Sequence, residues 1–119
     1  MSLDDANPHA NLDAMSDEDL DALEYGVVKM DLSGNVTGYN KAESDAAGFT
    51  KDRVLGRNFL EEVAPCTNNF MVAERFRSED ELSDEIDYVF TLRMRPTPVK
   101  LQMLKSASSS SMYLIVRWP

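Results

Sequence analysis

The sequence predicts an α+β fold in which an antiparallel sheet of about five strands carries short helices on one face and a helical cap at the N-terminus. Three observations predict it. A strand–turn–strand pattern occupies residues 25–40, broken helical segments fill residues 40–78, and alternating apolar residues dominate the last third of the chain. Two strands, several short helices and three further strands in this order favour a sheet with helices packed against it.

The first 24 residues are expected to form an N-terminal cap on a core of residues 25–119, within one structural domain. This segment is rich in acidic residues and poor in large apolar ones. Ser16 and Asp19 have the spacing of a capping box, at the start of a short helix whose apolar face carries Leu20. Because so short a helix is marginal without tertiary contacts, we expect the cap to detach more readily than the core.

The core begins with a predicted hairpin. Tyr25 to Leu32 has the pattern of a first strand, Ser33 to Asn35 supplies the turn, and Val36 to Asn40 forms the second strand. The helical region that follows is interrupted by glycine and proline. Its longest helical candidate is Phe70 to Leu82.

The C-terminal third predicts three strands. The first has an apolar face formed by Ile86, Tyr88, Phe90, Leu92 and Met94. The second follows the break at Pro96–Pro98 and presents Val99, Leu101 and Met103. After a serine-rich loop at 106–111, the last strand carries apolar residues on both faces. At this length, the order of elements is typical of a PAS-type sensor domain.

Composition excludes several classes of function. A formal net charge of −9 disfavours nucleic acid and anionic membranes as partners, and it fits either ordinary solubility or a high-salt habitat. The single cysteine excludes an internal disulfide, and no apolar run is long enough to span a bilayer. Met1 to Leu12 lacks the features of a signal peptide. We therefore expect a cytoplasmic monomer or weak dimer.

Cys66 is the first candidate functional residue. A lone cysteine is most often a small buried apolar group, and nucleophilic catalysis usually needs a neighbouring base. The sole histidine, His9, lies in the N-terminal cap, so neither a Cys–His dyad nor a metal site is expected. A third role is a covalent tether, in which the thiol holds an acyl group as a thioester inside a pocket that excludes water.

Tyr39 and Glu43 are candidates for the polar end of such a pocket. They are four residues apart, so a helical turn would direct the phenol and the carboxyl to the same space. On an apolar face, desolvation would raise the pKa of the Glu43 carboxyl and keep it as a neutral donor. Two converging donors stabilise an anion. The alternative is that Tyr39 ends a strand and Glu43 lies on a solvated helix face.

Three separated motifs carry a resemblance to a known family. The segments "GNVTGYNKAESDAAG", "GRNFLEEVAPCT" and "FTLRMRPTPVK" resemble motifs of the photoactive yellow protein family, in the order and near the spacing found there. The resemblance covers the chain from about Leu20 to Trp118. It implies a PAS-fold blue-light photoreceptor that carries p-coumaric acid (4-hydroxycinnamic acid) as its cofactor.

The resemblance also implies roles for individual residues. Cys66 would hold the chromophore covalently, and its backbone N–H would hold the thioester carbonyl. Tyr39 and a protonated Glu43 would donate to the phenolate oxygen, and Met94 would pack near the chromophore and assist its return to the dark state. Light would isomerise the chromophore, and a proton would then pass from Glu43 to the phenolate. The unpaired carboxylate would loosen the fold as the signal to an unknown downstream protein.

The sequence departs from the family pattern at three positions. Ala47 stands where a supporting threonine is usual, Phe49 where an arginine covers the chromophore, and Leu92 where an aromatic residue is usual. These differences bear on colour and recovery rate and leave the attachment chemistry intact. Further pocket candidates, each equally open to a reading as plain core, are Phe59, Val63, Phe90 and Met94. Trp118 is expected on the outside of the sheet or against the cap.

Two other functions compete with the photoreceptor. One is a PAS module that binds a non-covalent ligand or a protein, with Cys66 inert in the core. The other is a thiol-based peroxidase or reductase, against which the absence of a resolving cysteine counts. Because a histidine near Cys66 is also missing, we expect the chain not to be an enzyme. The joint occurrence of Tyr39 and Glu43 with the "APC" motif counts against the plain PAS module.

Overall fold

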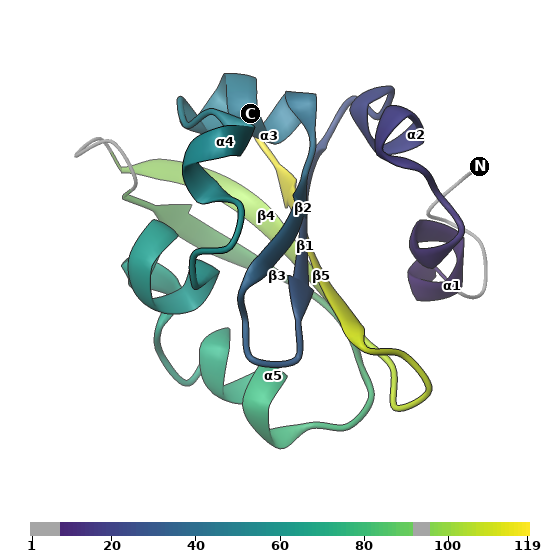
Figure 1. The fold of residues 1–119 in the computed structure, drawn as a ribbon. Helices are drawn as coiled ribbons and strands as arrows, with labels where there is room; N and C mark the ends of the chain where they lie inside the picture. The colour runs from purple at the N-terminus through teal and green to yellow at the C-terminus, as the bar shows by residue number, and fades with distance from the viewer. Residues whose placement is uncertain (1–7, 92–95) are drawn as a thin grey trace.

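A computed structural model describes residues 8–91 and 96–119, and it has the predicted α+β architecture with one five-stranded antiparallel sheet (Figure 1). The strands are β1 (Gly26–Asp31), β2 (Val36–Tyr39), β3 (Leu82–Phe90), β4 (Thr97–Lys105) and β5 (Ser111–Arg117). The helices are α1 (Pro8–Asp13), α2 (Asp17–Asp21), α3 (Lys41–Ala47), α4 (Lys51–Val54) and α5 (Ala73–Ser78), with a π-helical turn η1 (Phe59–Val63) and a 3-10 turn η2 (Pro65–Thr67). The strand order β2-β1-β5-β4-β3 places the last strand at the centre, which explains why it carries apolar residues on both faces.

The two faces of the sheet are sorted by the period-2 alternation of its strands. Val28 and Val116 face a core beneath α4, η1 and α5, whereas Val27, Tyr113 and Ile115 face the opposite side. In Figure 1, η1 and α5 lie to one side of the sheet and α1 and α2 to the other. The functional candidates therefore belong to the first core, and the N-terminal helices cover the second.

The N-terminal helices are docked by both apolar and polar contacts. Leu12 and Leu20 are buried against the outer face of the sheet, and the Tyr113 hydroxyl donates to Asp13 at 2.5 Å. The predicted capping box at the start of α2 is confirmed, because the Ser16 side chain accepts from the backbone N–H of Asp19 and the carboxylate of Asp19 accepts from that of Ser16. These contacts hold two helices that are too short to be stable alone.

The predicted helix from Phe70 to Leu82 is wrong at both ends. The helix α5 is only Ala73–Ser78, and Phe70 is 79% exposed. Long-range pairing overrides helical propensity at the far end, where Leu82 is already in β3 opposite Lys105. At the near end the Asn69 side chain accepts the backbone N–H groups of residues 71 and 72, so the chain turns there.

The predicted strand beginning at Ile86 starts four residues earlier, at Leu82, and its far end, with Leu92 and Met94, lies outside the described residues. Pro98 lies inside β4 instead of breaking it, opposite Val89 and before the residues of β4 that pair with β5. There its missing N–H costs no ladder bond to β5. In the described ranges, no helix has the length and apolar character required to cross a bilayer.

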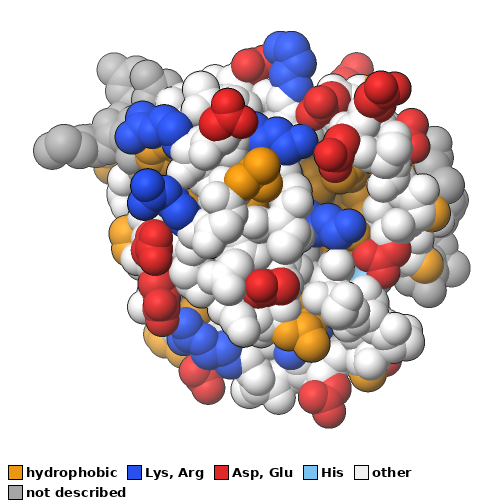
Figure 2. All heavy atoms as spheres, viewed as in Figure 1, with side chains coloured by type: hydrophobic (Ala, Val, Ile, Leu, Met, Phe, Trp, Pro, Cys, Tyr) orange, Lys and Arg blue, Asp and Glu red, His pale blue; other side chains and the backbone are white. Residues whose placement is uncertain are grey.

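The acidic character of the chain is unevenly distributed over the surface. Figure 2 shows Asp and Glu side chains gathered at the upper right, near where Figure 1 draws α2. That helix carries Asp17, Glu18 and Asp19 in its first turn, where the partial positive charge of the helix N-terminus favours them. Lys and Arg side chains are spread over the same face.

Candidate functional site

Tyr39 and Glu43 are brought together by the junction of β2 and α3. Asn40, between the last residue of the strand and the first of the helix, is the N-cap, and its Oδ1 accepts from the backbone N–H of Glu43 at 3.1 Å. The turn directs both side chains inward, leaving Tyr39 2% and Glu43 0% exposed. The alternative of a solvated Glu43 is therefore wrong.

Both side chains end in a polar atom without a partner. The Tyr39 hydroxyl and Glu43 Oε2 are buried and make no hydrogen bond with any described residue. A buried polar group left unpaired costs about 1–3 kcal/mol, and such groups are uncommon in native proteins. Two of them on adjacent elements indicate a site that receives a polar atom of a ligand.

Burial favours the protonated form of both groups. Desolvation raises the pKa of the Glu43 carboxyl from 4.5 to about 7, and a hydrogen bond from Trp118 opposes the rise. Desolvation also raises the pKa of the Tyr39 phenol far above its usual value, with a smaller contribution from the charge of Glu43. A neutral acid and a neutral phenol are both donors, so the pair suits an anionic oxygen.

Gly26 makes room for the Glu43 carboxyl at the start of β1. A Cβ built at this glycine would lie 2.0 Å from Glu43 Oε1 and 3.0 Å from its Cβ. The neighbouring Val27 N–H donates to Asn40 Oδ1 at 2.8 Å, so the strand and the helix cap are joined directly. A side chain at position 26 would displace the carboxyl from this space.

Trp118 contacts the site, contrary to the expectation that it packs on the outside of the sheet or against the cap. Its indole Nε1 donates to Glu43 Oε1 at 2.7 Å. Its ring meets Phe90 edge-on, with centroids 5.6 Å apart. Pairing of β5 with β1 places the end of β5 near α3, and this cannot be seen in the local sequence.

Cys66 lies half-buried in η2, against the same core. Its carbonyl oxygen is held from two directions, by the Tyr88 hydroxyl at 2.5 Å and by Asn69 Nδ2 at 3.1 Å. Thr67 adds a hydrogen bond from its hydroxyl to the carbonyl of Ala64 at 2.6 Å. These bonds fix the turn that carries the thiol, and sequence reasoning assigned none of them.

The predicted pocket residues gather around this core. Tyr39, Phe59 and Phe90 are buried in one cluster, against which Phe49, Val63, Cys66 and Trp118 pack. Ala47 is fully buried in α3. Met94 lies outside the described residues, so its predicted role stays a prediction.

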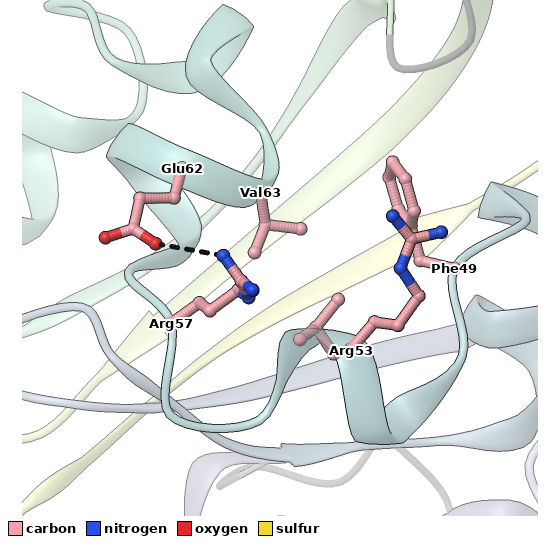
Figure 3. A pocket seen from close by; sticks show the side chains of 6 residues that line it. Phe49, Arg53, Arg57, Glu62 and Val63 are labelled. Atoms are coloured by element: carbon pink, nitrogen blue, oxygen red, sulfur yellow. Dashed lines mark ion pairs between the residues drawn. The ribbon is translucent and has the colours of Figure 1, made fainter.

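A pocket of about 170 Å³ opens beside Phe49 and Val63 (Figure 3). Arg53 and Arg57 also line it, and Figure 3 shows the Arg53 guanidinium beside the Phe49 ring, 5.9 Å from its centroid. Arg57 pairs with Glu62 at 3.8 Å. Phe49 thus stands at a rim that already carries a positive charge from Arg53, which sequence reasoning did not assign to the site.

The described part of the chain has no cluster of three or more His, Cys, Asp and Glu suited to a metal ion. What the site offers is a thiol, a pair of neutral donors and an apolar lining. The thiol can form a covalent bond, and the two donors can hydrogen-bond an acceptor atom of a ligand.

Comparison with known proteins relates the chain to one family of receptors. No family model matches it. The photoactive yellow protein of Halochromatium salexigens is 39% identical over 106 residues, which cover 87% of this chain and 85% of that protein. The photoactive yellow protein of Rhodothalassium salexigens is 33% identical over 106 residues, which again cover 87% of this chain and 85% of that protein.

Comparison with solved structures points to the same family. The photoactive yellow protein domain of the sensor histidine kinase Ppr from Rhodospirillum centenum superposes with a TM-score of 0.82 at 35% identity, covering 91% of this chain and 97% of that one. A PAS domain of an HTR-like protein from Haloarcula marismortui, 15% identical with a TM-score of 0.64, covers 92% of this chain and 96% of its own. The latter supports the PAS fold alone.

Proposed function

Because the chain belongs to the photoactive yellow protein family and is therefore a blue-light photoreceptor of PAS fold, we propose that Cys66 carries p-coumaric acid as a thioester. The observation that carries this proposal is the pair of unpartnered buried atoms, the Tyr39 hydroxyl and Glu43 Oε2. Both belong to groups that are neutral donors. They supply what a buried phenolate requires.

The cofactor, when bound, supplies a phenolate that absorbs blue light and a double bond that light isomerises. Cys66 Sγ holds the acyl end, and the Tyr88 and Asn69 side chains keep its turn in place through the Cys66 carbonyl. Phe59 and Phe90, both buried, exclude water from the ring. Tyr39 and Glu43 donate to the anionic oxygen.

Glu43 is the group that moves a proton. An anion beside it raises its pKa further, so the carboxyl stays protonated in the dark. Loss of that proton leaves a carboxylate with no exposed surface, and an uncompensated buried charge costs several kcal/mol. That cost is comparable with the whole stability of a small domain, so the fold loosens.

The N-terminal helices are the segment we propose to move. Asn40 caps the helix of Glu43 and also donates to the carbonyls of Leu20 and Tyr25, at 2.8 and 2.9 Å. A shift of α3 therefore strains the bond to the end of α2. We propose that the uncovered face is read by a signalling protein, as the kinase context of the Rhodospirillum centenum domain suggests.

Reconstitution tests the proposal. The apoprotein is mixed with p-coumaric anhydride, whose acyl group passes to Cys66 Sγ while p-coumarate leaves and the thiol proton goes to solvent. We expect the intact mass to rise by one p-coumaroyl group and a visible band to appear that bleaches in blue light. Cys66→Ala, which removes the sole thiol, should give neither, and a coloured adduct on that variant would refute the assignment.

Two variants separate the tether from the donors. Tyr39→Phe and Glu43→Gln should still form the adduct, because neither group takes part in acyl transfer. Both should shift the visible band, because the phenolate loses or exchanges a donor. A band unchanged in both variants would count against the placement of the phenolate at these atoms.

A further inference from the structure

Trp118 is the single tryptophan of the chain and follows the last residue of β5. It is half-buried, with its ring edge against Phe90 at 5.6 Å and its Nε1 at 2.7 Å from Glu43 Oε1. It also lines a groove of about 590 Å³ on the surface with Tyr88 and Val99. The residue thus reaches from the surface of the sheet to a fully buried carboxyl.

The chemistry of the indole distinguishes the two carboxyl oxygens. An indole N–H can only donate, so Glu43 Oε1 must be the acceptor of this bond. In a neutral carboxyl the carbonyl oxygen is the better acceptor, and the hydroxyl oxygen carries the proton. Oε2, the oxygen without a partner, is therefore the one left to hold the proton and to donate it.

We infer that Trp118 is a positioning residue for the Glu43 proton, which holds Oε1 as the acceptor so that Oε2 carries the proton toward the ligand space. The same bond persists when the proton leaves, because an N–H donor also binds a carboxylate and does so more strongly. The role of Oε2 as donor to a chromophore rests on the proposed function. The bond between Trp118 and Glu43 does not.

Few other charges act on this carboxyl. Tyr39 is the titratable group whose pKa responds to the charge of Glu43. On the helix of Glu43, Lys41 and Asp45 are exposed and paired with each other at 2.6 Å. On β5, Arg117 pairs with Glu85 at 3.7 Å. The indole is the one polar partner of the Glu43 carboxyl among the described residues.

Nuclear magnetic resonance on the full-length apoprotein tests the inference without the chromophore. A single tryptophan gives a single indole N–H resonance. We expect the chemical shift of the indole N–H to change with pH at the same midpoint as the chemical shift of the Glu43 carboxyl carbon. The indole shift should lose this pH dependence in Glu43→Gln. In Trp118→Phe the Glu43 midpoint should rise by about one pH unit, because a donor to the carboxylate is lost.

Tyr113→Phe is the matched control. It removes a hydroxyl that donates to Asp13 from an aromatic residue on the opposite face of the sheet, and it should leave the Glu43 midpoint unchanged. The inference would be overturned if the Glu43 midpoint shifted equally in both variants or did not shift in Trp118→Phe. It would also be overturned if the indole resonance did not respond to the Glu43 titration. If Trp118→Phe fails to fold, the comparison of wild type with Glu43→Gln decides alone.

The outcomes also separate this inference from the proposed function. If the indole follows Glu43 but p-coumaric anhydride gives no adduct, the photochemical role falls and the positioning of the proton stands. If the coloured adduct forms but the indole does not follow Glu43, the positioning role falls alone. In the coloured protein, Trp118→Phe should shift the visible band whereas Tyr113→Phe should not.

Discussion

Glu43 shows how a single buried side chain can set the pH response of a small domain. The carboxyl has no exposed surface, and desolvation raises its pKa to about 7 in the folded chain. An unfolded chain returns the group to its ordinary value of 4.5. Between these values the folded state binds a proton that the unfolded state has lost, so the stability of the apoprotein falls as pH rises.

This linkage predicts the behaviour of Glu43→Gln. The stability that the wild type owes to its neutral carboxyl is fully present below pH 4.5 and lost as pH rises through about 7. The loss amounts to about 3 kcal/mol, whereas the amide of the variant does not titrate. Urea unfolding at a series of pH values should therefore give a steeper decline for the wild type, and equal slopes would contradict the assigned burial of Glu43.

Gly26 gives a second prediction for single residues. Gly26→Ala places a methyl group 2.0 Å from Glu43 Oε1, so the carboxyl must move and we expect a loss of about 1–3 kcal/mol in unfolding free energy. Gly38→Ala is the matched control, because the nearest atom to its added Cβ is the Lys29 Cβ at 3.1 Å, a tight contact without the overlap found at Gly26. Reconstituted Gly26→Ala should also show a shifted visible band, and equal effects of the two variants on stability and colour would count against a role of Gly26 in seating Glu43.

The sequence predicted some of these residues and missed others for one reason. Tyr39 and Glu43 are near neighbours whose spacing on a turn can be read locally, and Cys66 is unique. Trp118 is 75 residues from Glu43, and only the strand order brings them together. Their contact could not be predicted without the fold.

At the scale of elements, the turn that carries the thiol depends on a strand far along the chain. The Cys66 carbonyl accepts from the Tyr88 hydroxyl on β3, and Asn69 Nδ2 lies 2.5 Å from the same hydroxyl. Asn69 also ends the turn by capping the backbone of residues 71 and 72. The 3-10 turn η2 is thus anchored to the strand β3.

Tyr88→Phe should loosen this turn while leaving the sheet intact. The loss of a hydrogen bond from a half-buried hydroxyl should lower the unfolding free energy by about 1 kcal/mol. The Cys66 thiol should also react several-fold faster with a disulfide reagent, because its turn opens more often. Tyr113→Phe, which loses a comparable hydrogen bond on the opposite face, should leave the reaction rate of the Cys66 thiol unchanged. If Cys66 in Tyr88→Phe reacts at the wild-type rate, Tyr88 does not anchor the turn.

Elements with a clear period were predicted well, and those decided by tertiary pairing were not. The alternating pattern of Val99, Leu101 and Met103 located β4, and the apolar run near the C-terminus located β5. The helix predicted at Phe70–Leu82 failed at its far end because β3 begins at Leu82, which pairs with Lys105 of β4. A helical period can be read from one segment, whereas competition with a distant strand cannot.

At the scale of the whole molecule, two cores share one sheet. The inner core holds the site, and the outer one is closed by α1 and α2 through Leu12 and Leu20. Asn40 joins them, because it binds the carbonyl of Leu20 and caps the helix that carries Glu43. A charge formed on Glu43 can therefore affect the docking of the N-terminal helices through the hydrogen bonds of Asn40.

This arrangement predicts that the two cores differ in how they unfold. Leu12→Ala should lower the free energy of opening the cap by about 2–4 kcal/mol and should speed hydrogen exchange in α1 and α2. Leu101→Ala, an equally buried leucine of the inner core, should speed exchange throughout the sheet. If Leu12→Ala accelerates exchange equally in all five strands, the cap is not a separate unit.

The most direct test of the account follows the Glu43 proton itself. An infrared difference spectrum of the reconstituted protein, recorded with and without blue light, reports protonated carboxyls and carboxylates separately. We predict that the light state loses the carbonyl band of one protonated carboxyl and gains carboxylate bands, and that Glu43→Gln lacks both changes. A wild-type spectrum without carboxyl loss, or the same loss in Glu43→Gln, would contradict the account.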